Sequence, residues 1–130
     1  MLKNILITVV CLSLLSFSNF SNASVAEALA NICAIVKADD KGELRKKMRT
    51  VQSDYAMKLR DYYEGISCGN KSLIRVAILN NALKTGTLLV KKMPKKSLAA
   101  PESDGKTLLA WIDEQGLAEN PVALVVKDRM

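Results

Sequence analysis

The sequence predicts an all-α protein of short helices held together by one disulfide. Three observations lead to this prediction. Apolar residues recur at helical spacing along most of the chain, and two cysteines remain once an N-terminal export segment is set aside. Residues 71–130 also repeat one pattern, in which a polar cap is followed by a short apolar helix, a break and a second short apolar helix.

Residues 1–23 have the features of a secretory signal peptide. The apolar run from Ile5 to Leu15 has the length of a signal core and is too short to cross a bilayer. We expect cleavage after Ala23, with Ala26 as the second choice. Residues 24–130 would then form a single helical domain in the periplasm. The alternative, an uncleaved membrane anchor, is disfavoured by the length of the run, and no later run is long enough to span a membrane.

Cys33 and Cys68 are the two cysteines that would remain after cleavage. An even pair in a small exported domain favours a disulfide, which in the chain-entropy model contributes about 3 to 4 kcal/mol. The two positions are too far apart for a redox motif of the Cys-x-x-Cys type. Because the chain contains no histidine, it also lacks the usual ligands for a mixed zinc site.

Residues 24–70 are predicted to form three disulfide-linked helices. The first runs through Val25, Leu29, Ile32 and Val36 and carries Cys33 toward the core. Asp40 caps the second, whose apolar face is Leu44, Met48 and Val51. The third is predicted to begin at Ser53, with a turn at Cys68–Asn70, and its expected buried residues are Tyr55, Leu59, Tyr62 or Tyr63, and Ile66.

Residues 71–130 show the internal repeat at a shift of 35 positions. Ser72 then falls over Thr107, and both are expected to cap helices, the first running through Leu83. Asn81 falls over Gly116 at the break. Leu89–Val90 falls over Leu124–Val125 in the second helix of each copy. Between the copies, Lys91–Lys106 is predicted to be a basic loop containing Pro94, Pro101 and Gly105.

These residues resemble the ankyrin repeat. Ser72–Ala77 is similar to the Thr-Pro-Leu-His-x-Ala start of that motif, and Asp104–Leu109 is similar to the turn and start of the next repeat. Leu73 and Leu108 replace the proline of the motif, while Arg75 and Ala110 replace its histidine. The resemblance implies two ankyrin-like helix–turn–helix pairs, capped by the disulfide-linked helices, and a protein-binding role. An ordinary helical bundle of similar short helices is the alternative.

A second resemblance covers residues 25–90. The order of Cys33, a basic helix, Ile66–Asn70 and an apolar helix is similar to a family of small exported bacterial proteins with two cysteines and unassigned function. It implies a periplasmic setting and the disulfide, and it implies no activity.

The sequence offers little chemistry for catalysis. Without histidine, the Ser-His-Asp and Cys-His nucleophile systems are absent. Paired carboxylates are the remaining acid–base candidates: Asp39/Asp40, Asp61/Glu64 and Asp113/Glu114. Of these, Asp61 and Glu64 alone have a spacing that places both on one helix face. We expect them to form solvated ion pairs, and we predict no enzymatic activity, cofactor or metal.

Charge is distributed unevenly, with a net charge of +6. Basic residues concentrate in Lys41–Arg60 and Lys91–Lys96, and acidic residues in Glu102–Glu119. Nucleic acid is an unsuitable partner because the chain is expected to be exported and its aromatic residues, including Trp111, occupy core spacing. The leading hypothesis is a non-catalytic periplasmic protein that binds another protein, and the alternative is a basic envelope protein attracted to anionic lipid or polymer. The predicted contact residues are Lys84, Lys91, Lys92, Met93, Lys95, Lys96 and Asp104.

Overall fold

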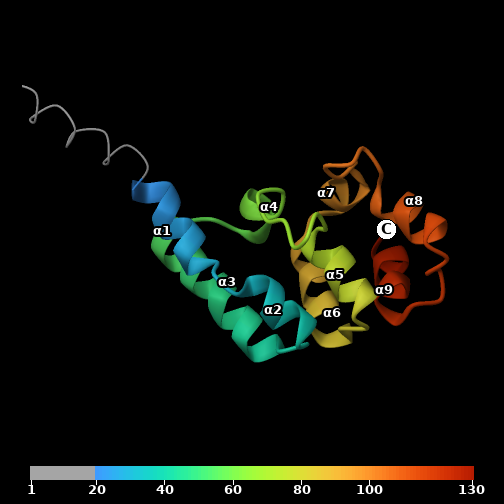
Figure 1. The fold of residues 1–130 in the computed structure, drawn as a ribbon, viewed down its shortest axis with the longest axis horizontal. Coiled ribbons are helices and arrows are strands. Elements are labelled where there is room, and N and C mark those ends of the chain that lie inside the picture. The colour runs from blue at the N-terminus through green and yellow to red at the C-terminus, as the bar shows by residue number, and fades with distance from the viewer. Residues whose placement is uncertain (1–19) are drawn as a thin grey trace, which may run out of the picture. The chain divides into compact units, whose positions relative to one another are not determined.

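The computed structural model describes residues 20–130, which form α-helices and no β-strand (Figure 1). The helices are α1 (Phe20–Ala28), α2 (Ile32–Lys37), α3 (Lys41–Tyr55), α4 (Leu59–Tyr62), α5 (Leu73–Leu79), α6 (Leu83–Lys92), α7 (Lys95–Ala99), α8 (Leu108–Glu114) and α9 (Pro121–Arg129). The all-α prediction is therefore confirmed. The predicted signal core, Ile5–Leu15, lies outside the described residues, and the expected cleavage position after Ala23 falls within α1.

The described residues divide between two compact units. Helix α1 belongs to the first unit, and residues 31–130 form the second. Among residues 20–130, no helix has the length and apolar content needed to cross a membrane.

Helix α5 lies at the centre of the second unit. Its residues from Leu73 to Ile78 are all buried, and it packs against α2, α6 and α9. The α6 helix in turn contacts α3, α4 and α9, so the core is a layer of short helices around the α5–α6 pair (Figure 1). Helices this short are marginal alone in water, and tertiary packing must supply their stability.

The boundaries of the N-terminal helices differ from the prediction. The periodic run from Val25 to Val36 is interrupted at Asn31, which adopts a left-handed conformation with φ of 65°. Asparagine tolerates that conformation better than most residues, so apolar periodicity did not reveal the break. Ser53 begins no helix, because α3 continues through Tyr55 and ends at Ala56, which has φ of 53°. The predicted cap at Asp40 is confirmed, since its carboxylate accepts a hydrogen bond from the Glu43 N–H at 3.2 Å.

The predicted disulfide is confirmed. Cys33 on α2 is bonded to Cys68 in the α4–α5 connection, with the two Cα atoms 5.8 Å apart. Cys68 is buried, and its backbone N–H donates to the carbonyl of Lys71 at 2.8 Å. The bond therefore joins α2 to the segment that leads into the central helix α5.

A distant carboxylate completes the start of α6. The residue preceding this helix is Ala82, whose side chain has no hydrogen-bond acceptor. Asp39, in the α2–α3 turn, accepts from the backbone N–H of Thr85 at 2.8 Å and from the Thr85 hydroxyl at 3.2 Å. The single proton of this hydroxyl is shared with the carbonyl oxygen of Val36, which lies 3.1 Å from the hydroxyl oxygen. Free N–H groups in the first helical turn need acceptors, and here the acceptor comes from 46 residues away.

The break in each helix pair has the same geometry in both copies. After α5, Asn81 has φ of 52° and the Ala82 N–H donates to Ala77 at 2.9 Å. After α8, Gly116 has φ of 69° and the Leu117 N–H donates to Ile112 at 3.0 Å. These are helix C-terminal turns with a left-handed residue, and they stand at the predicted shift of 35 positions.

The second helices of the two pairs follow a different register. Asn120 starts α9, and its side chain accepts hydrogen bonds from the N–H groups of Val122 and Ala123. The buried residues Thr85, Gly86 and Leu89 of α6 therefore correspond to the buried residues Val122, Ala123 and Val126 of α9, at a shift of 37 positions. As a result Leu124 is 47% exposed whereas Leu89, aligned with it by the sequence pattern, is fully buried. The predicted loop Lys91–Lys106 also contains helix α7.

Removing the disulfide should lower the free energy of unfolding by about 3 to 4 kcal/mol, because the cross-link closes a loop of 35 residues in the unfolded chain. Urea unfolding of the Cys33→Ser/Cys68→Ser double variant, followed by circular dichroism, measures this loss. Reduced wild-type protein is the control and should unfold at the same urea concentration as the double variant. Equal midpoints for the oxidised and reduced proteins would contradict the prediction.

Gly86→Ala should destabilise the protein by about 1 to 3 kcal/mol, although alanine favours helices. A Cβ at Gly86 would lie 2.7 Å from Val122 Cγ1 and 3.2 Å from the Cβ of Ala77, both fully buried. The control is Gly42→Ala in α3, where the nearest atom is 3.7 Å away and helix propensity should raise stability by up to about 1 kcal/mol. Thermal denaturation of both variants should show shifts of opposite sign.

Candidate functional site

A buried arginine organises the polar interior. Arg75 on α5 is 5% exposed, and its Nη1 and Nη2 donate to Asp104 at 2.6 and 2.9 Å. Its Nε lies 2.6 Å from Glu102 Oε1, and Nη2 also donates to the Lys106 carbonyl at 3.3 Å. The guanidinium stands 5.0 Å from the ring centroid of Trp111. A buried cation is tolerated only with such counterions and acceptors, so Arg75 holds the turn at residues 102–106 against α5.

Glu102 extends this network to the preceding segments. Its Oε2 accepts a hydrogen bond from the Tyr63 hydroxyl at 2.7 Å, and its Oε1 accepts from the Ser72 hydroxyl at 2.9 Å. Burial, followed by the negative charge of Glu102, raises the pKa of Tyr63 well above its ordinary value. Tyr63 is therefore a stable neutral donor. Three segments therefore meet at the Glu102 carboxylate. They are the end of α4, the end of the loop that follows Cys68, and the α7–α8 connection.

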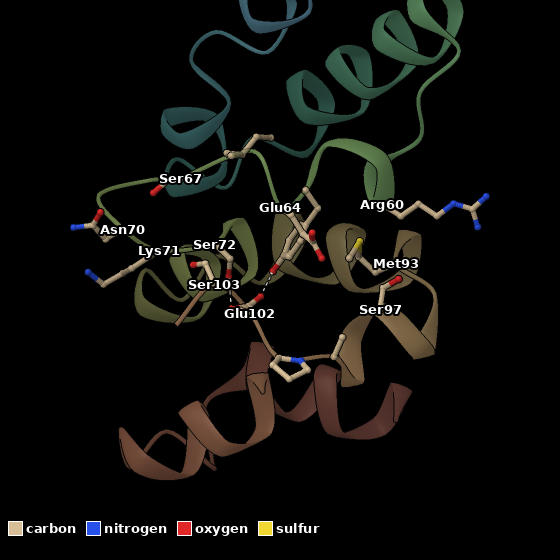
Figure 2. A pocket seen from close by; sticks show the side chains of 14 residues that line it. Arg60, Glu64, Ser67, Asn70, Lys71, Ser72, Met93, Ser97, Glu102 and Ser103 are labelled. Carbon is tan, nitrogen blue, oxygen red and sulfur yellow. Dashed lines mark hydrogen bonds between the residues drawn. The ribbon is translucent and has the colours of Figure 1, made fainter. Parts of the chain in front are cut away.

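A cavity of about 530 Å³ opens over this carboxylate (Figure 2). Figure 2 shows Glu102 in its middle, Asn70 and Lys71 on one side, and Met93 and Ser97 on the other. The rest of its lining combines apolar and polar side chains: Arg60, Tyr63, Glu64, Ile66, Ser67, Ser72, Ala100, Pro101 and Ser103. This volume falls in the range of ligand-binding pockets.

The carboxylates in and near the cavity already have defined partners. Glu102 is occupied by Arg75, Tyr63 and Ser72. Asp61 accepts the backbone N–H of Lys58 at 2.8 Å and lies 3.9 Å from the Arg60 guanidinium, so it supports the start of α4. Glu64 alone of the predicted Asp61/Glu64 pair lines the cavity. The cavity therefore presents hydrogen-bonding groups to a ligand, whereas the Glu102 carboxylate at its centre holds structural contacts.

In each of the other predicted carboxylate pairs, the two members have different surroundings. Asp39 accepts from Thr85, whereas its neighbour Asp40 caps α3. Glu114 forms an exposed ion pair with Lys106 at 2.8 Å, while Asp113 is exposed on α8. Within residues 20–130, no group of three or more cysteine or acidic side chains is arranged to hold a metal ion.

The structure separates the predicted contact residues into three groups. Lys84 is exposed in the first turn of α6, and Lys91 and Lys92 are exposed in its last turn, about 10 Å away along the helix. Lys95 and Lys96 are exposed in the first turn of α7. These four later lysines thus lie on helix ends and not on a loop, which corrects the sequence-based picture.

Met93 differs from the expectation of an exposed contact, whereas Asp104 is exposed but already has a partner. Met93 is 3% exposed because it packs into the core at the end of α6, although part of it lines the cavity. Asp104 is bound to Arg75, so its charge is already neutralised. Sequence reasoning missed Arg75 and Glu102 as the centre of the site. The available signal was Arg75 itself, the one charged residue in the apolar helix Leu73–Leu79.

The fold and the site define a small all-helical protein with a disulfide and a preformed cavity. The model of the DUF3718 family, described as a protein of unknown function, matches residues 32–100. This range is more than half of the chain and contains both cysteines of the disulfide, and the chain belongs to that family. No curated protein and no solved structure matches it.

Asp104→Asn should make the free energy of unfolding depend less on pH in the acidic range. The hydrogen bonds from Arg75 and then from the Lys106 N–H hold the pKa of Asp104 well below its usual range. An acid whose pKa is lower in the folded state contributes stability above the unfolded pKa of about 4, and this contribution falls as the pH drops below that value. Urea unfolding measured from about pH 6 to about pH 2.5 should therefore show the difference in free energy of unfolding between wild type and variant becoming smaller as the pH falls. The control is Asp113→Asn, the same change at an exposed position, which should show no such difference.

Proposed function

We propose that this chain is a non-catalytic module, exported to the periplasm, that binds another protein through the cavity over Glu102. The observation that carries the proposal is a cavity of about 530 Å³ whose lining mixes apolar and hydrogen-bonding side chains. Such a surface suits a partner's side chain with an apolar body and a polar end.

The cavity walls are held in place before any partner arrives. One wall follows Cys68, which is bonded to Cys33, and another is the 101–103 segment that precedes Asp104. Glu102 joins the walls through Tyr63 and Ser72. Binding to a preorganised site avoids the entropy cost of ordering loops, so a modest contact area can still give useful affinity.

The exposed lysines near the cavity add a charge preference. Lys95 and Lys96 stand at the start of α7, between Met93 and Ser97, which both line the cavity. Positive charge on the rim of an interface raises the rate of association with an acidic partner. The proposed partner is therefore a protein with an acidic segment beside the inserted side chain.

The proposal includes two ankyrin-like helix pairs and a periplasmic location. The matching turns at Asn81 and Gly116 support two related helix pairs, with α2 and α3 packed beside the first. The disulfide supports an oxidising compartment, which agrees with the predicted signal peptide. Repeated helix pairs commonly serve protein binding.

A second candidate is electrostatic attachment to an anionic envelope polymer or lipid surface. The exposed lysines on α6 and α7 and the net charge of +6 favour it. It requires no cavity, and its binding should fall steeply with salt. A protein partner that stays bound at high salt would argue against it.

Filling the cavity should abolish capture of the partner. Ser67 and Ser103 line the cavity and are exposed, so Ser67→Trp and Ser103→Trp block it with little cost to folding. Oxidised protein is immobilised and incubated with periplasmic extract, and each variant should recover at least about tenfold less of a partner that wild type captures in constant ratio. The control is Ser53→Trp on the exposed surface of α3.

Three outcomes would contradict this assignment. Undiminished capture by both cavity variants would remove the cavity from the binding surface. If Leu124→Asp lost capture instead, the interface would lie on the exposed face of α9, where Leu124 is 47% exposed. Wild-type recovery of heterogeneous anionic material that washes off in salt would favour the electrostatic candidate.

A further inference from the structure

A second hollow, of about 620 Å³, lies between α3, α4 and α6. We call it the basic groove. Its α3 wall is formed by Arg45, Met48, Arg49 and Gln52, which share one helix face because they are spaced three and four residues apart. Every lining residue belongs to the range 32–100 that the family model matches.

The charge of the basic groove is one-sided. Arg45 and Arg49 from α3, Lys58 before α4 and Lys92 from α6 line it, and no acidic residue does. In the part of the chain that the structure describes, the ion pairs involve other cations, and these four belong to none of them. These four exposed side chains line one hollow, so their positive charges repel one another, and a bound anion would relieve that repulsion.

The floor of the basic groove is apolar. Leu59 and Leu88 are 3% and 6% exposed, and Met48 is half-buried beside them. A simple inorganic anion would leave this surface uncovered. The volume is also in the range that accommodates an organic molecule, far beyond the size of a phosphate ion.

Tyr62 supplies a donor without an acceptor. Its side chain lines the basic groove and is 4% exposed, and its hydroxyl has no hydrogen-bond partner among the residues that the structure describes. Burial, and then the charge of Asp61, raises the pKa of Tyr62 to about 12, so the hydroxyl stays protonated at neutral pH. Buried polar groups are nearly always paired, and an unpaired one calls for an explanation such as a ligand.

We propose that the basic groove binds a small amphiphilic organic anion, whose carboxylate or phosphate lies among the four cations and whose apolar body covers Leu59 and Leu88. The Tyr62 hydroxyl donates to the anion or to an oxygen next to it. This site lies apart from the cavity over Glu102 and does not depend on the proposed protein partner. The anion can be free in solution or be the head of a lipid, since both present the same chemistry.

The first experiment compares ligands on the full, oxidised protein. Isothermal titration with octyl phosphate and with octanoate should show binding of one molecule per chain. Octanol, which lacks the charge, and inorganic phosphate, which lacks the apolar body, should each bind at least about tenfold more weakly. Equal affinity for inorganic phosphate would overturn the amphiphilic part of the proposal, and absence of binding by both octyl ligands would overturn all of it.

Matched variants test the position of the site. Lys58→Gln/Lys92→Gln removes two lysines of the groove, whereas Lys37→Gln/Lys46→Gln removes two exposed lysines that do not line it. Octyl phosphate should bind about tenfold more weakly to the first double variant and within about twofold of wild type to the second. Equal weakening in both would mean diffuse attraction by net charge and would overturn a defined site.

Tyr62→Phe tests the contribution of the hydroxyl to binding separately from its contribution to stability. Because the hydroxyl has no partner in the described structure, its removal should leave the melting temperature unchanged or raise it. Octyl phosphate affinity should nevertheless fall by about threefold or more. Unchanged affinity would overturn the role given to Tyr62.

A vesicle arm distinguishes the two sources of the anion. Co-sedimentation with phosphatidylglycerol vesicles, lost in Lys58→Gln/Lys92→Gln and absent with phosphatidylcholine, would support a lipid head as the ligand. Binding of octyl phosphate without co-sedimentation would support a free amphiphile. If the protein bound neither octyl phosphate nor phosphatidylglycerol vesicles, the proposal would be overturned, whatever the outcome of the partner capture.

Discussion

The burial of one arginine constrains much of this fold. Arg75 lies in a helix whose other six residues are all apolar, and an unpaired guanidinium there would cost far more than the domain's marginal stability allows. Asp104 and Glu102 must therefore reach it, which brings the α7–α8 connection back across 29 residues of chain. Trp111 then covers the guanidinium from α8. The site over Glu102 is a consequence of this pairing, because the carboxylate is already present where the cavity opens.

The remaining helices are held to the α5–α6 pair by a few long-range polar contacts. Asp39 supplies the acceptor that Ala82 lacks at the start of α6, and the disulfide draws α2 toward the segment before α5. Asn120 donates to Ile78 at 2.9 Å while its own oxygen caps α9. Each short helix contributes little alone, so such contacts, with close approaches like that at Gly86, select one packing among many similar ones.

The same frame leaves two hollows of different chemistry. The cavity over Glu102 combines both signs of charge with hydroxyl groups, whereas the basic groove has cations above an apolar floor. Their walls come from different faces of the α4–α6 region, since Tyr63 contributes to the first and Tyr62 to the second. Two adjacent residues at the end of α4, Tyr62 and its C-cap Tyr63, thus take part in both.

The sequence by itself determined the helical class, the Cys33–Cys68 disulfide, the caps at Asp40, Ser72 and Thr107, and the repeated break at Asn81 and Gly116. These features depend on local spacing and local hydrogen bonding, or on the chemistry of an even cysteine pair. Tertiary structure alone decided the partners of Arg75, the acceptor at Thr85, the burial of Met93 and the convergence of Arg49 with Lys92. These depend on contacts between residues far apart in the chain, and apolar periodicity contains no information about which distant charge meets which.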